Sequence, residues 1–152
     1  GSEMCIRDSY NCGYCKTIHN EIISLTNDQD LDLVVYFYQF PILSESSRIY
    51  SKILMAVAEQ NTEEAIKLHG KIMNNKGNLN QDKLNNFLKE ININQQKFEE
   101  DIVGVNIEEK LEVSYYIAKR IGGSGTPLLI INNFVEQGFL KRSEIEKLFN
   151  YN

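Results

Sequence analysis

Two cysteines near the start of the chain have the spacing that thiol–disulfide exchange requires. Residues 10–16 read YNCGYCK, so that two residues separate Cys12 from Cys15, and a helical pattern follows at once. The N-terminus of a helix carries about half a positive charge and unpaired N–H groups, which favour a thiolate over a thiol. Thiols so placed have pKa values lowered from about 8.5 to roughly 3.5–7.5. The pair is therefore expected to exchange between dithiol and disulfide.

The elements that must position this pair begin as an α/β pattern. Residues 12–26 carry apolar side chains at helical spacing. The run at 33–40 reads LVVYFYQF, and its apolar, β-branched and aromatic residues predict a strand buried on both faces, which Pro41 ends. A helix followed by such a strand favours an α/β unit with parallel pairing.

The middle of the chain is predicted to be helical throughout. Ser44, Asn61, Asn80 and Asn94 are residue types that cap helix N-termini, and each precedes a stretch with helical periodicity. A longer helix is predicted over 106–121. Four or five helices in succession, with no strand between them, indicate an inserted helical block.

The end of the chain returns to α/β character. Residues 122–127 read GGSGTP, a flexible loop, and the apolar run at 128–131 predicts a strand. Two asparagines then indicate a hairpin turn, with a returning strand at 134–136. A closing helix is predicted over 143–149.

Composition narrows the class of protein. The 152 residues form one domain, and 42% hydrophobic and 24% charged residues are ordinary for a globular protein. A net charge of −5 argues against nucleic acid or an anionic membrane as a partner. No apolar run approaches the roughly 20 residues of a membrane-spanning helix, so no membrane insertion is expected. A signal peptide is not evident, and the chain is expected either to stay in the cytosol or to have lost its leader.

Taken together, these motifs resemble the DsbA-like branch of the thioredoxin superfamily. The resemblance rests on YNCGYCK at 10–16, FPIL at 40–43 and GTP at 125–127, and covers nearly the whole chain from Tyr10 onward. It implies an α/β thioredoxin-like fold with an inserted all-helical domain. The thioredoxin-like parts would be about 10–44 and 119–152, within a single domain at 10–152, and the insertion would be about 45–118.

The resemblance also implies roles for the cysteine motif. Cys12 would attack the partner's sulfur and Cys15 would resolve the mixed disulfide, while Gly13 and Tyr14 would tune the redox potential. The expected positions of the two cysteines agree with these roles. Cys12 stands at the start of the helix, within reach of solvent, whereas Cys15 lies one turn inside and should be shielded. No cofactor beyond the redox-active Cys12–Cys15 disulfide is expected, and no metal.

Thr126 and Pro127 are the second group of site residues that the resemblance implies. The Thr126–Pro127 bond would be cis, which only X–Pro bonds adopt at a tolerable cost, about 0.5–1 kcal/mol. In the family this loop lies against the cysteine pair, and the residue before the proline offers backbone groups to an extended substrate. Thr126 would therefore be a peptide-docking position.

The first nine residues are unusual. Gly1-Ser2 is typical of a cloning remnant, and residues 3–9, EMCIRDS, resemble the translation of a transposase adapter used in sequencing libraries. Cys5 would then have no function. The family places its first central strand here, with an acidic residue six positions before the first cysteine, where Ile6 stands. We therefore expect that strand to be missing or replaced by this segment, and the chain to be less stable than the untruncated protein.

The function that the resemblance implies is thiol–disulfide oxidoreduction through mixed disulfides. The protein would oxidise or isomerise disulfides in exported proteins, and an oxidase is favoured over an isomerase. Its partners would be unfolded or extended polypeptides that contain cysteine, together with a membrane redox partner. The implied location is a bacterial periplasm, with the signal peptide lost from the truncated end.

Two alternatives belong to other classes. One is a redox-inactive truncated fragment or peptide-binding interaction domain. The other is a zinc-bound domain, because Cys5, Cys12, Cys15 and His19 are zinc-type ligands in a plausible order. Against zinc, Cys5 belongs to the adapter-like segment and the Thr-Pro loop would have no role. His19 and His69 are expected to be packed structural histidines.

Overall fold

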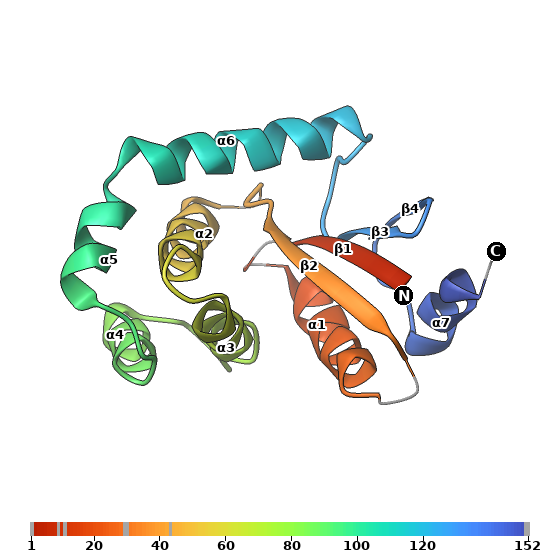
Figure 1. Cartoon of the computed structure of the whole chain (residues 1–152), viewed down its shortest axis with the longest axis horizontal. Helices are drawn as coiled ribbons and strands as arrows, with labels where there is room; N and C mark the ends of the chain where they lie inside the picture. The colour runs from red at the N-terminus through yellow and green to blue at the C-terminus, as the bar shows by residue number, and fades with distance from the viewer. Residues whose placement is uncertain (1, 9, 11, 29–30, 43, 151–152) are drawn as a thin grey trace.

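The computed structural model describes residues 2–8, 10, 12–28, 31–42 and 44–150. Within them the chain forms a small sheet and two groups of helices (Figure 1). The elements in chain order are β1 (Ser2–Asp8), α1 (Gly13–Thr26), β2 (Leu33–Gln39), α2 (Glu45–Ala58), α3 (Thr62–Met73), α4 (Gln81–Lys89), α5 (Gln95–Ile102), α6 (Val105–Arg120), β3 (Leu128–Ile131), β4 (Phe134–Gln137) and α7 (Arg142–Phe149).

The strand that precedes the cysteine motif occupies the centre of the sheet. The strand order is β2-β1-β3-β4, with β1 parallel to β2 and antiparallel to β3. Cys5 of β1 stands opposite Tyr36 on one side and Ile130 on the other. The segment expected to replace the first central strand thus forms a strand of seven residues with partners on both sides.

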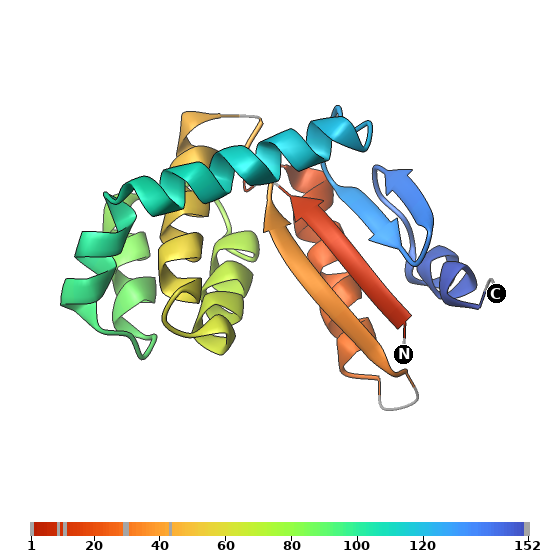
Figure 2. The ribbon, with the colours of Figure 1, turned by 45° about the horizontal axis from the view of Figure 1, so that its top comes forward.

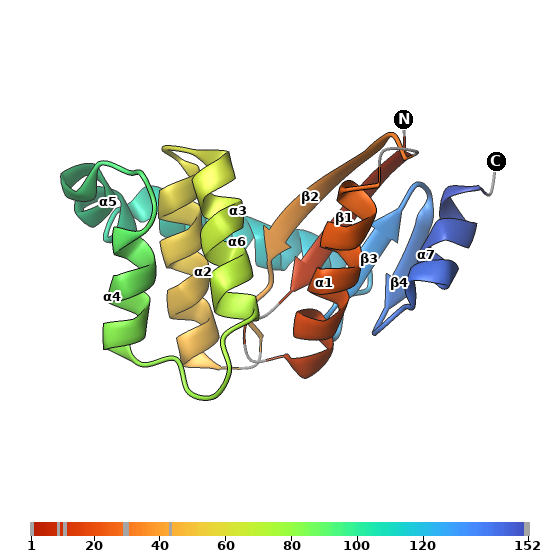
Figure 3. The same cartoon turned by 90° about the horizontal axis from the view of Figure 1, so that it is seen from below.

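Helices cover the two faces of the sheet unequally. α1 and α7 pack on one face through a cluster that includes Met4, Ile22, Leu129 and Ile145. On the other face α6 packs through a smaller cluster of Phe40, Ala118 and Leu128. Figure 3 shows α1 in front of the strands and α6 behind them. No helix in these parts of the chain is both long and apolar enough to span a bilayer.

The helices α2–α5 form a separate block beside the sheet, and α6 runs from this block to the strands (Figure 2). The predicted helix starts are confirmed by their caps. Ser44 Oγ accepts the N–H of Ser47 at 3.1 Å, and Asn80 Oδ1 accepts that of Lys83 at 2.9 Å. Asn61 and Asn94 cap α3 and α5 in the same way. Each cap satisfies an N–H that the first helical turn leaves without a partner.

The prediction that β2 is buried on both faces is wrong. β2 is an edge strand, and Val34, Tyr36 and Tyr38 on its outer face are 47%, 43% and 39% exposed. The alternate residues Val35 and Phe37 pack towards α1 and α7. The apolar run concealed this alternation, because valine and tyrosine suit a half-exposed strand as well as a buried one.

Candidate active site

Cys12 is the residue at which α1 begins. Its backbone is extended, with φ −102° and ψ 112°, and the helix starts at Gly13. The N–H of Cys15 donates to Cys12 Sγ at 3.1 Å, so the sulfur itself caps the helix. Cys12 and Cys15 are joined in a disulfide with their Cα atoms 5.2 Å apart. A negative charge on Cys12 Sγ would face this N–H and the positive end of the helix dipole.

The two cysteines differ in their access to solvent. Cys15 is completely buried, which confirms that it is shielded, whereas Cys12 retains 5% of its surface. The opening to Cys12 is therefore narrower than the sequence suggested. Gly13 is exposed, and Tyr14 is 67% exposed, so most of the tyrosine ring faces solvent.

The Thr-Pro loop lies against the motif. Cys12 Sγ is 3.4 Å from the carbonyl oxygen of Thr126, and the Thr126–Pro127 peptide bond is cis. Pro127 is buried, and its carbonyl oxygen accepts the N–H of Gly138 at 2.8 Å. The predicted site residues from the two ends of the chain are therefore brought together.

Gly123 fixes the start of this loop. Its N–H donates to the carbonyl oxygen of Ala118 at 2.8 Å, which ties the loop to the end of α6. A Cβ at position 123 would stand 2.7 Å from that oxygen and 2.8 Å from a methyl carbon of Leu128. Further along the loop, Ser124 N–H donates to Gln137 Oε1 at 3.1 Å. The loop that carries Thr126 is therefore held from both sides.

A buried group of aromatic and imidazole side chains behind the motif was not predicted as part of the site. The hydroxyl of Tyr10 is 2.7 Å from His69 Nδ1, and the Tyr10 N–H donates to Ser47 Oγ at 2.9 Å. The ring of His69 lies 4.7 Å from that of His19, measured between centroids. Both histidines are 2% exposed. The separation of one helical turn between Cys15 and His19 could have indicated from the sequence that His19 lies near the site, whereas no local pattern indicated His69.

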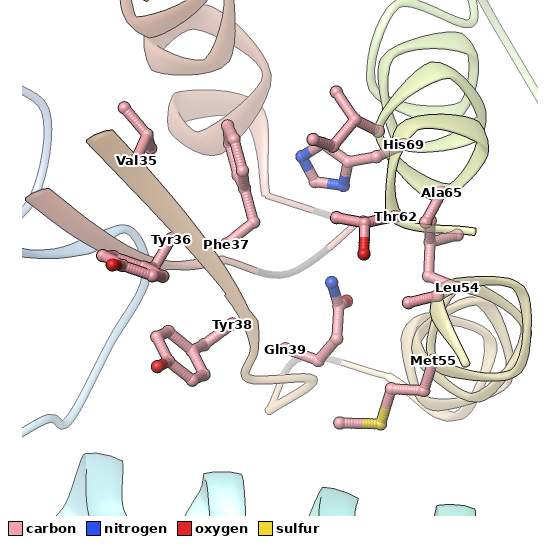
Figure 4. A pocket seen from close by; sticks show the side chains of 12 residues that line it. Val35, Tyr36, Phe37, Tyr38, Gln39, Leu54, Met55, Thr62, Ala65 and His69 are labelled. Atoms are coloured by element: carbon pink, nitrogen blue, oxygen red, sulfur yellow. The ribbon is translucent and has the colours of Figure 1, made fainter. Parts of the chain in front are cut away.

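Two cavities adjoin these residues. One, of about 320 Å³, is lined by Tyr10 and Lys16 beside the motif and by residues of α2, α3 and the turn after α3. The other, of about 310 Å³, lies between β2 and the helices α2 and α3, with His69, Gln39 and Thr62 among its lining (Figure 4).

Metal-binding geometry is not found in the described residues. They include no group of three or more histidine, cysteine, aspartate or glutamate side chains that could hold an ion. Cys12 and Cys15 bond to each other. The side chain of Cys5, which the zinc alternative requires, lies outside the described part of the structure.

Comparisons with known proteins place these features in context. The family model of the DSBA-like thioredoxin domain matches residues 8–148. The solved structure of the thiol-disulfide exchange protein alpha-DsbA2 from Wolbachia pipientis superposes with a TM-score of 0.89 at 26% identity, covering 100% of this chain and 82% of that one. No curated protein matches the sequence significantly.

More distant structures share the fold. The catalytic domain of Proteus mirabilis ScsC has a TM-score of 0.83 at 20% identity, over 98% of this chain and 81% of that one. Oxidised BdbD from Bacillus subtilis has a TM-score of 0.82 at 17% identity, over 98% and 88% respectively.

Proposed function

Because the chain belongs to the DSBA-like thioredoxin family, we propose that it is a protein disulfide oxidoreductase that acts on exported polypeptides. Family membership confirms the expected thioredoxin-like fold with a helical insertion and supports thiol–disulfide exchange as its chemistry. The observation that carries the proposal is the placement of Cys12, which caps α1, is bonded to Cys15 and faces the Thr126 carbonyl.

The proposed reaction starts from the disulfide. A substrate thiolate attacks Cys12 Sγ, the Cys12–Cys15 bond breaks, and Cys15 leaves with the electron pair and takes up a proton. A second substrate thiolate then attacks the substrate sulfur of the mixed disulfide, and Cys12 leaves as a thiolate. The substrate gains a disulfide and the protein becomes a dithiol. The Cys15 N–H and the start of α1 stabilise the departing Cys12 thiolate, which favours oxidation of the substrate.

We assign substrate recognition to the residues around Cys12. The backbone of Thr126 would pair with an extended polypeptide, as in strand addition, while Pro127 holds that backbone beside the sulfur. Gly13 and Tyr14, which separate the cysteines, would set the redox potential through the donors that reach the thiolate. The cavity beside Lys16 offers room for a side chain of the substrate.

A periplasmic location and a membrane redox partner that reoxidises the dithiol belong to the same proposal. A structural neighbour from Salmonella enterica serovar Typhimurium is described as a periplasmic thioredoxin-like protein, at 18% identity. An oxidase remains favoured over an isomerase, and the equilibrium of the Cys12–Cys15 pair with glutathione separates the two. A strongly oxidising pair supports the oxidase.

The direct test is oxidation of a peptide that carries two cysteines. The oxidised protein should oxidise it, and Cys12→Ser should abolish the reaction. In a separate reaction, the Cys12 thiolate of Cys15→Ser should attack a disulfide-linked dimer of a single-cysteine peptide, release one peptide as a thiolate and retain the other as a mixed disulfide that mass spectrometry detects. A Cys5→Ser background restricts the chemistry to the pair. Equal activity of the parent and Cys12→Ser would leave a redox-inactive peptide-binding domain as the better description, and metal analysis of the reduced protein tests the zinc alternative.

A further inference from the structure

The buried position of Cys15 poses a chemical requirement that the motif itself does not meet. Cys15 has no exposed surface, and burial disfavours the charged thiolate. In the proposed function, however, Cys15 must lose a proton to attack a mixed disulfide on Cys12 and must regain one when it leaves. A proton acceptor within the protein would make both steps faster, because bulk water does not contact this residue.

His19 is a buried imidazole on the same helix as Cys15. Cys15 and His19 are one helical turn apart on the same side of α1, and residues at this separation are neighbours on a helix surface. Both are buried, and α3 approaches His19 closely because Gly70 has no side chain. A Cβ at position 70 would lie 3.6 Å from His19 Nε2.

The imidazole of His19 lies beside other groups that can accept and donate protons. Its ring contacts that of His69 on α3, with centroids 4.7 Å apart, and His69 Nδ1 is 2.7 Å from the Tyr10 hydroxyl. The apolar ring of Phe37 on β2 lies 6.0 Å from His19 and 5.1 Å from His69. Among the residues that the structure describes, the titratable groups at this site are Cys15 from α1, His69 from α3 and Tyr10 from the segment before the motif.

A route from these groups to solvent exists on the side of β2. His69 lines the cavity of about 310 Å³ between β2, α2 and α3. Tyr36 and Tyr38 line the same cavity, and both are exposed, so the cavity reaches the surface. Figure 4 shows that His69 and the polar side chains of Gln39 and Thr62 surround this cavity.

We propose that His19, oriented by His69 and Tyr10, is the proton acceptor for the resolving cysteine. The Cys15 thiol transfers its proton to the His19 imidazole as its sulfur attacks Cys12 Sγ. The Cys12–Cys15 bond forms, the bond from Cys12 to the partner's sulfur breaks, and the partner leaves as a thiolate. The proton passes to solvent past His69. In the reverse direction the imidazolium returns the proton to Cys15. The proposal rests on the proposed function, since it assigns a group to the resolving step.

A two-step colorimetric reaction isolates that step. Reduced protein, in a Cys5→Ser background, is mixed with a symmetrical aromatic disulfide that releases a coloured thiolate. Cys12 attack releases the first equivalent and Cys15 attack the second. His19→Gln should slow the second release, relative to the first, by roughly tenfold to a hundredfold at neutral pH. Histidine changes charge between about pH 5 and 8, so the inflection of the second rate in that range should also disappear.

Ile22→Val is the matched control. Ile22 is a fully buried residue of α1, and shortening it weakens packing without removing a titratable group. Its ratio of second to first rate and its pH profile should equal those of the parent. A His19→Gln ratio and profile that match the control would overturn the assignment.

His69→Gln and Tyr10→Phe keep the test decisive if His19→Gln does not fold. Each alters the orientation of the acceptor, so the pH midpoint of the second release should move, and an unchanged midpoint in the variants that fold overturns the relay. A parent protein that releases no coloured thiolate would instead overturn the proposed function as a whole.

Discussion

Cys12 Sγ and the carbonyl oxygen of Thr126 lie 3.4 Å apart, although 114 residues separate them in the sequence. In the dithiol form the Cys12 S–H group can donate to this oxygen. The Thr126 loop therefore borders the sulfur on one side, while the start of α1 borders it on the other.

The first prediction follows from the unequal access of the two sulfurs. In the reduced protein Cys12 should be alkylated by iodoacetamide at least about tenfold faster than Cys15, because Cys12 keeps some exposed surface and caps a helix, while Cys15 has none. Peptide mapping by mass spectrometry measures both rates. In urea the two rates should converge, and equal rates under native conditions would contradict the burial of Cys15.

The second prediction concerns the loop that carries Thr126. Gly123→Ala should lower the free energy of unfolding by about 1–3 kcal/mol, because its Cβ would stand 2.7 Å from the backbone oxygen of Ala118. Gly13→Ala is the control, since a Cβ there meets nothing within 4 Å, and it should not lower stability. Urea denaturation compares the two. A Gly123→Ala protein as stable as Gly13→Ala would show that the loop accommodates the methyl group by moving.

The third prediction links a carboxylate in the helical block to acid stability. The Glu64 carboxylate accepts hydrogen bonds from Lys67 Nζ at 2.6 Å and from the N–H of Asn92 at 3.0 Å. Both bonds lower the pKa of the Glu64 carboxyl, and the bond from Lys67 has the larger effect. A lowered folded pKa gives stability that is present above the ordinary value of 4.5 and is lost as the pH falls through the folded value.

Glu64→Gln should accordingly be less stable than the parent at neutral pH, and the difference should shrink as the medium becomes acidic. Denaturation midpoints across a pH series measure it. Glu63→Gln, at the exposed neighbouring position, controls for the loss of one negative charge in the first turn of α3. A Glu64→Gln deficit that is constant with pH would exclude this linkage.

The fourth prediction tests the central strand by hydrogen exchange. The backbone of residues 4–7 pairs with β2 on one side and β3 on the other, so their amides should exchange more slowly than those of β4, which pairs with β3 alone at the sheet edge. The adapter-like sequence of this segment instead predicts a replaced strand in a less stable chain. Exchange at residues 4–7 as fast as in β4 would support that expectation instead.

Sequence patterns predicted the helices well because helix starts are local. Ser44, Asn61 and Asn80 bond to N–H groups two or three residues ahead, so residue type and periodicity contain the necessary information. The hairpin at Asn132 was predictable for the same reason. Its φ of 52° lies in a region that asparagine tolerates better than most residues.

Features that depend on contacts between distant parts of the chain could not be predicted from local sequence patterns. The exposure of Tyr36 depends on which strand lies at the sheet edge, and a short apolar run is the same for an edge strand as for a central one. The contact between His19 and His69 depends on how α3 packs on α1. The approach of Thr126 to Cys12 was expected only through the family resemblance.

The side on which the cysteine pair packs has a practical consequence for redesign. Cys12 and Cys15 belong to the same buried cluster as Leu68 and Ile72 of α3, whereas the sheet is packed by a different cluster. Substitutions at Leu68 and Ile72 would thus change the dielectric surroundings and the room around the sulfurs from outside the cluster that packs α1 and α7 on the sheet. A library confined to these two positions leaves His69 and its contact with Phe37 of β2 in place, so it would vary the behaviour of the pair while the packing of the sheet is kept.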